Sequence, residues 1–159
     1  MKAIHFTIAA AALSFVQPTP ASAAQGDPEV LIYRGSGVLD TGGGNLVGVG
    51  TAFHCTNFSG VIENVRFVIR SQGGAIAANQ VLPVPHLNTA TALTKVAVIY
   101  IGASLDTGFI KQGTVAIAAT SINVTCTASQ FDASVNGAFS PPPGKLHMTR
   151  FNPVPGTQE

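Results

Sequence analysis

The sequence predicts a single-domain, all-β fold, an antiparallel β-sandwich, from three observations. The chain is rich in turn-forming residues, with 17 glycines and 10 prolines, and has no tryptophan. Several short segments alternate apolar and polar residues, which is the period of a strand with one buried face. Turn signals separate these segments at regular intervals, and about eight short strands in such an arrangement are typical of a sandwich or barrel, of which we expect the sandwich.

Residues 1–23 predict a secretory signal peptide ahead of that domain. Lys2 gives a positive start, Ile8–Val16 form an apolar stretch, and small residues precede a cleavage point after Ala23. We therefore expect one mature domain over 24–159 with a proline-rich C-terminal tail. We also expect a secreted or periplasmic location, oxidised cysteines, and no transmembrane segment after cleavage.

The first half of the domain predicts three strands. Val30–Tyr33 is a short strand, and the glycine-rich segment Gly35–Asn45 connects it to the next. Two cleanly alternating strands follow, at Leu46–Asn57 and around Phe67. The residues expected to face inward are Val47, Val49, Phe53 and Cys55 in the first of these, and Val65, Phe67 and Ile69 in the second.

The second half predicts an edge strand, a central strand and three others. Ala75–Leu82 ends at prolines, which cannot donate to a ladder, so we place it at an edge. Thr89–Ile101 also fits helical spacing, but its β-branched residues and the absence of a cap favour a strand buried on both faces. The last strands are expected at Gly113–Ala119, Ile122–Ala128 and Lys145–Phe151, and the middle one turns Ile122, Val124, Cys126 and Ala128 inward.

Cys55 and Cys126 are the only cysteines, and both lie on inward faces of predicted strands. We expect one inter-sheet disulfide between them, with Cα atoms about 5 to 6.5 Å apart; two buried free thiols are the alternative. The cysteine spacing resembles that of immunoglobulin-like domains, which implies an immunoglobulin-like architecture. The buried tryptophan and the corner tyrosine of that family are missing, so only the architecture is carried over.

Two Asp-Thr-Gly sequences are the strongest indication of an enzyme. They begin at Asp40 and Asp106 and resemble the signature of aspartic proteases, in which two such aspartates share a proton and activate water. The motifs are too close in the chain for a two-lobed protease, and a half enzyme that dimerises would carry only one. Asp-Thr-Gly also suits a turn. We expect two exposed turn residues with no catalytic role, and Asp40 and Asp106 remain the alternative catalytic pair.

The composition and the histidines argue against nucleic acid, metal and cofactor binding. Charged residues make up only 9% of the chain, and without Lys2 basic and acidic residues balance, so no basic stripe could neutralise phosphates. His54 and Cys55 are neighbours on a strand and point to opposite faces, while His86 and His147 share no ligand spacing with them. No phosphate-loop pattern is present. We expect no metal and no cofactor.

Three segments carry a wider resemblance: Phe53–Ser59, Ile117–Ser121 and the tail Thr149–Glu159. Through them the chain resembles a group of small uncharacterised exported proteins of Gram-negative bacteria. The resemblance covers most of the mature chain and implies export. It implies no activity.

The sequence as a whole indicates an exported, non-enzymatic binding or structural module of the cell envelope or extracellular space. Low charge and apolar strands favour an envelope or extracellular protein as partner over a small charged ligand. The alternative is an aspartic-protease-like hydrolase. Geometry separates the two, because a protease needs both carboxylates within hydrogen-bond reach.

Overall fold

The computed structural model describes residues 26, 28–134 and 144–151, and the predicted signal peptide and C-terminal tail lie outside them. This part of the chain is all-β, as predicted, with no helix. No helix that could span a membrane occurs there. The strands are β1 (Val30–Asp40), β2 (Val49–Asn57), β3 (Glu63–Arg70), β4 (Ile76–Val84), β5 (Thr89–Leu93), β6 (Ala103–Ser104), β7 (Ile110–Ala119), β8 (Val124–Asp132), β9 (Gly144–Leu146) and β10 (Met148–Arg150).

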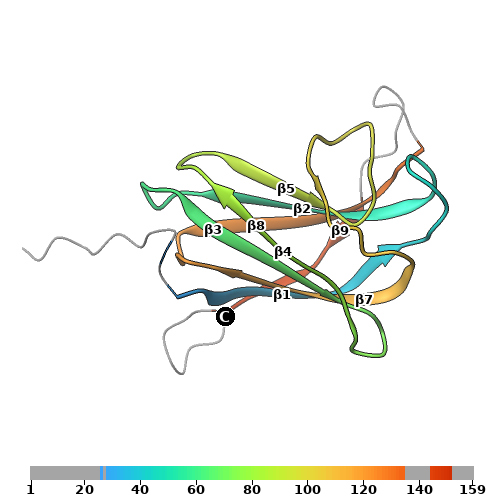
Figure 1. Ribbon diagram of the computed structural model, residues 1–159, viewed down its shortest axis with the longest axis horizontal. Helices are drawn as coiled ribbons and strands as arrows, with labels where there is room; N and C mark the ends of the chain where they lie inside the picture. Colours follow the sequence, from blue (N-terminus) through green and yellow to red (C-terminus); the bar gives the residue numbers. More distant parts are fainter. Residues whose placement is uncertain (1–25, 27, 135–143, 152–159) are drawn as a thin grey trace, which may run out of the picture.

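The strands form one continuous mixed sheet that curls into a half-barrel. Its main path runs β4-β3-β7-β1-β2-β5-β6, and β8 pairs with the other edge of β2. Figure 1 shows β2, β5 and β8 along the upper side and β1 and β7 along the lower side. The two sides join where Asp40 pairs with Gly50 as well as with Ile110. The expected division into two separate sheets is therefore not confirmed.

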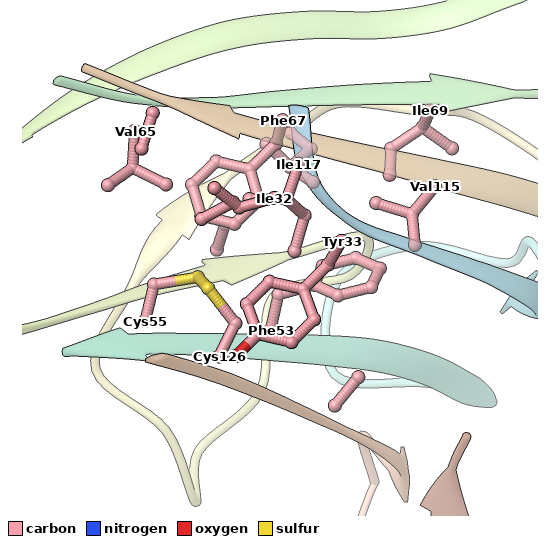
Figure 2. Packing of buried hydrophobic residues seen from close by; sticks show 14 of the residues in the cluster. Ile32, Tyr33, Phe53, Cys55, Val65, Phe67, Ile69, Val115, Ile117 and Cys126 are labelled. Carbon is pink, nitrogen blue, oxygen red and sulfur yellow. A yellow bond between two sulfur atoms is a disulfide. The ribbon is translucent and has the colours of Figure 1, made fainter. Parts of the chain in front are cut away.

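The core fills the inside of the curl, and most of its members were expected there. The predicted inward residues of β3 are fully buried, and so are Phe53 and Cys55 in β2. Figure 2 shows these side chains gathered with Ile32 and Tyr33 of β1 and Ile117 of β7. Val47 was expected inside but is 53% exposed, because the chain turns at Leu46 and Gly48 before β2 begins.

The disulfide forms between the predicted cysteines, but it does not join two facing sheets. Cys55 and Cys126 are directly opposed in the antiparallel pairing of β2 with β8, and their Cα atoms are 4.1 Å apart. Alternation showed correctly that both side chains point inward. It did not distinguish strands that face each other from strands that lie side by side. Figure 2 shows the bridge at one side of the buried cluster.

The predicted strand over Thr89–Ile101 is wrong beyond Leu93. The chain leaves the sheet there, and the loop 94–102 returns over the outer face of β2. Its apolar residues form a second small core with the outward side of the upper strands; the members are Ala52, Leu93, Ala97, Phe131 and Ala133, with Ile99 and Tyr100 packed against them. Burial on both faces of β2 thus comes from a loop that covers one of them.

Several smaller differences follow from tertiary pairing. β1 continues through Gly35–Asp40, part of the expected glycine-rich connection, because β7 pairs with it along most of its length. β4 lies at the end of the sheet path, as its prolines predicted. Ile122 was expected inside but precedes β8 and is 43% exposed.

Candidate functional site

The two Asp-Thr-Gly sequences meet at one end of the half-barrel, on the right in Figure 1. Asp40 ends β1, and the second motif leads into β7, whose first residue Ile110 pairs with Asp40. This antiparallel pairing brings the motifs together around a cavity of about 280 Å³. Asp40, Asp106 and Lys95 all line it. The two motifs, which are distant in the sequence, are therefore neighbours in the fold.

Asp40 is buried, which corrects the expectation of an exposed turn residue. Its Oδ1 accepts the Gly42 N–H at 2.9 Å, so the expected turn forms. The same oxygen lies 3.1 Å from Lys95 Nζ, and both side chains are less than a tenth exposed. Thr107 of the second motif donates to Asp40 Oδ2 at 3.4 Å. The first carboxylate is thus held by both loops that surround it.

Lys95 is the residue of this site that the sequence interpretation missed. Its Nζ donates to the Gly42 carbonyl at 2.9 Å and to the Gly44 carbonyl at 3.5 Å, in addition to the ion pair. The start of its side chain packs so closely on Gly50 that a Cβ there would lie 2.8 Å from Lys95 Cβ. A single lysine inside the apolar segment after β5 was the available signal, because a buried cation needs a carboxylate partner.

Threonines extend the contacts from the ion pair into the sheet. Thr94 donates to the Leu39 carbonyl at 2.7 Å and accepts the Thr51 N–H at 2.8 Å. Thr107 lies within 3.3 Å of the Thr94 carbonyl. The start of the loop after β5 is therefore fixed to β1 and β2 by these side-chain bonds and by the backbone bond from the Thr94 N–H to the Thr51 carbonyl at 2.9 Å.

Asp106 has a different environment from Asp40. It is exposed and has a φ of 47°. Its Oδ1 accepts the Ser104 hydroxyl at 2.8 Å. Asp106 is therefore exposed, as expected, although Thr107 beside it is buried, and the two carboxylates have separate partners. One is buried beside a cation, and the other faces solvent.

The opposite end of the half-barrel is organised around Asn57 and Glu63. Asn57 is fully buried; its Nδ2 donates to the carbonyls of Val61 and Val84 at 2.7 and 2.8 Å, and its Oδ1 accepts the Ser59 N–H at 2.8 Å. Glu63 is also fully buried. Thr120 donates to its Oε2, while its Oε1 has no hydrogen-bond partner among the described residues.

Four large apolar side chains project from the loops at this end, which we call the apolar tip: Phe58, Ile62, Leu87 and Ile122, between 43% and 64% exposed. Backbone bonds fix their loops to one another. Phe58 N–H donates to the Asn123 carbonyl at 2.8 Å, and Leu87 N–H donates to the Asn57 carbonyl at 2.7 Å. The tip is therefore a set of apolar residues on hydrogen-bonded loops.

The remaining predicted residues are dispersed. His54 Nδ1 lies 3.0 Å from the Thr91 hydroxyl, its ring contacts Tyr100, and partial burial lowers its pKa. His86 Nδ1 accepts the Gly60 N–H at 3.0 Å. His147 lies between β9 and β10, beside two surface hollows, one of which it shares with His54.

Comparison of the chain with protein-family models, curated proteins and solved structures found no match. The chemistry of the site must therefore be inferred from its own geometry. The cavity at the Asp40 end offers an ammonium already bonded to protein oxygens and one solvent-facing carboxylate, Asp106. The tip at the other end offers apolar surface.

Proposed function

We propose that this protein is an exported, non-enzymatic binding or structural module of the cell envelope or extracellular space. The observation that carries the proposal is the apolar tip. Exposed apolar side chains gain free energy when a partner covers them, and contiguous patches of them mark contact surfaces. A protein surface of the envelope or extracellular space is the partner that suits this chemistry.

The supports beneath the tip favour recognition by a preformed surface. Asn57 lies directly under it and bonds to the loop of Phe58 and to the end of β4. The disulfide at Cys55 is two positions away on β2. Loops that are ordered before binding lose less conformational entropy in a complex, so more of the contact energy appears as affinity.

The environment of Asp40 also supports a non-enzymatic role. An aspartic dyad works because two carboxylates compete for one proton. Here Lys95 lies beside Asp40 and offers it a counter-charge, while Gly42 and Thr107 donate hydrogen bonds to its oxygens. These contacts suit a carboxylate that ties loops together.

A capture experiment with matched variants tests the binding proposal. Phe58→Ser removes an apolar side chain of the tip that is 53% exposed, and Ile76→Ser removes one that is 56% exposed on β4. The oxidised protein and both variants are used to capture partners from envelope and culture-medium fractions. We expect Phe58→Ser alone to lose the captured partner. Identical capture by all three proteins would contradict the proposal.

An aspartic-protease-like hydrolase is the second candidate, because Asp40 and Asp106 line one cavity and Thr107 contacts Asp40. In that mechanism the two carboxylates would activate a water between them. A peptidase assay at acid pH, with Asp106→Asn as the first variant because this residue is exposed, tests it directly. Activity that is lost in Asp106→Asn, with an unchanged circular dichroism spectrum, would make the hydrolase the leading function.

A further inference from the structure

The outer face of β1, β7 and β3 carries a hollow of about 520 Å³ whose charged walls are all basic. Arg34 from β1, Arg70 from β3 and His147 line it, together with the hydroxyls of Ser36, Thr114 and Thr149. No aspartate or glutamate is among its lining residues. We call it the arginine hollow. In a chain with so few charges, two arginines on one hollow make a local positive field.

The register of the strands explains the shape of the hollow. Ala116 on the central strand β7 lies opposite Arg34 on one side and Val68 on the other. Thr114 lies opposite Ser36 and Arg70 in the same way. The central strand therefore carries short side chains, while each flanking strand carries an arginine. Since the flanking strands are about 10 Å apart, the two guanidinium groups can reach over the floor from opposite sides.

Neither arginine is neutralised by a carboxylate in the described part of the chain. Arg34 lies 5.6 Å from the centre of the Phe151 ring, and Arg70 donates to the Gly74 carbonyl at 2.8 Å. Both contacts leave N–H groups of the guanidinium free to bind oxygen. Contact with the face of an aromatic ring also holds the Arg34 guanidinium in place without using its donors.

Arg66 provides an internal comparison, because it lies on β3 four residues before Arg70. Glu29 accepts from its Nε at 2.5 Å and from its Nη2 at 3.1 Å, which is a bidentate pair. The hydrogen bond to Glu29 raises the pKa of Arg66. At Arg66, therefore, the fold supplies a carboxylate partner. The hollow next to it has arginines and no such partner.

We propose that the arginine hollow binds an anionic ligand with at least two oxyanion groups, phosphate or carboxylate. Each guanidinium would hold one group in a bidentate manner, and the hydroxyls of Ser36, Thr114 and Thr149 would donate to the remaining oxygens. This site is separate from the apolar tip, so it does not depend on the proposed protein contact there. It adds a small-ligand activity to the molecule.

Titration with pyrophosphate and citrate, followed by amide chemical shifts of the oxidised protein, tests the proposal and distinguishes phosphate from carboxylate. We expect saturable shifts at Gly35, Ser36, Thr114 and Thr149 with at least one probe. Arg34→Gln and Arg70→Gln should each weaken binding about tenfold or more, because each removes charge-assisted hydrogen bonds.

Lys111→Gln is the matched control. Lys111 is an exposed basic residue of β7 that lies outside the hollow, where its Nζ is 5.7 Å from the centre of the Phe109 ring. It should leave the affinity unchanged. All three variants change exposed side chains, so loss of folding should not obscure the result. Equal weakening by Lys111→Gln would show non-specific charge attraction, and no localised shift with either probe at about 10 mM would overturn the proposal.

Discussion

The two ends of the half-barrel each bury a carboxyl group, but the two carboxyl groups have different partners. Asp40 has a cation beside it and hydrogen bonds to both of its oxygens. Glu63 has one hydroxyl partner, and its second oxygen has none among the described residues. Removing the lysine from a buried ion pair lowers stability strongly, because the carboxylate is left buried without its cation. Replacing a buried carboxyl that has no cation should lower stability much less. The comparison predicts that the two ends respond differently to similar substitutions.

Loss of the disulfide should have the largest effect, and it should loosen the Asn57 end more. The bridge closes a loop of 71 residues, so the paired substitution of Cys55 and Cys126 by alanine should cost about 4 kcal/mol of unfolding free energy. Chemical denaturation measures the total. Hydrogen exchange should show faster opening at Phe58 and Leu87 than at Thr41. Equal acceleration at both ends would remove this distinction.

Lys95→Met should cost about 3 kcal/mol, because it leaves the Asp40 carboxylate buried without its cation. The combined variant Asp40→Asn with Lys95→Met should recover much of this loss. An asparagine keeps the oxygen that accepts from Gly42 and carries no charge. Denaturation of the single and double variants measures the difference. A double variant that is less stable than Lys95→Met would contradict the explanation.

Glu63→Met is the matched substitution at the other end, and it should change stability by less than about 1 kcal/mol. The methionine side chain has a similar volume, and Thr120 retains the Asn64 N–H as a partner for its hydroxyl oxygen. The same denaturation series gives the comparison with Lys95→Met. A larger loss of unfolding free energy in Glu63→Met than in Lys95→Met would contradict the proposed difference between the two ends.

His54 lies on β2 between the two ends and should give the smallest effect, a mild loss of stability in acid. Burial lowers its pKa below 6.5 in the folded protein, so the unfolded chain binds the proton more readily. The pH-dependent contribution of His54 to the free energy of unfolding is therefore absent well above pH 6.5. It becomes destabilising as the pH falls through that value. Melting temperatures of the protein and His54→Gln should converge at neutral pH and diverge near pH 5. Parallel curves would exclude this origin.

The residue pattern within a single strand predicted which side chains face inward and which strand lies at an edge of the sheet. Alternation placed Phe53, Cys55 and Phe67 inside, and the prolines placed β4 at an edge. The same patterns could not show which strand lies beside which, so a disulfide within the sheet was expected to join two sheets. They also could not show that the loop 94–102 covers β2, because a loop that packs on a sheet and a buried strand can carry the same apolar residues.

The site was predicted less well than the fold, because it depends on contacts between residues that are distant in the sequence. Asp40 and Asp106 were both expected to be exposed turn residues, but the burial of Asp40 follows from the position of Lys95, which is distant in the sequence. The total numbers of basic and acidic residues were equally uninformative about the arginine hollow. A balanced charge concealed that the acidic partners are used elsewhere, as Glu29 is by Arg66.

The pairing order of the strands has a consequence for how the chain acquires its structure. β3 and β4 are the only consecutive strands in the described part that pair along their full length. β1 pairs with β7, and β2 pairs with β8, so the main ladders connect segments that emerge from the ribosome far apart in time. Chains with such distant pairings fold slowly. A newly made molecule therefore lacks its β1–β7 and β2–β8 ladders until most of it is synthesised, which suits a polypeptide expected to pass a membrane before it folds.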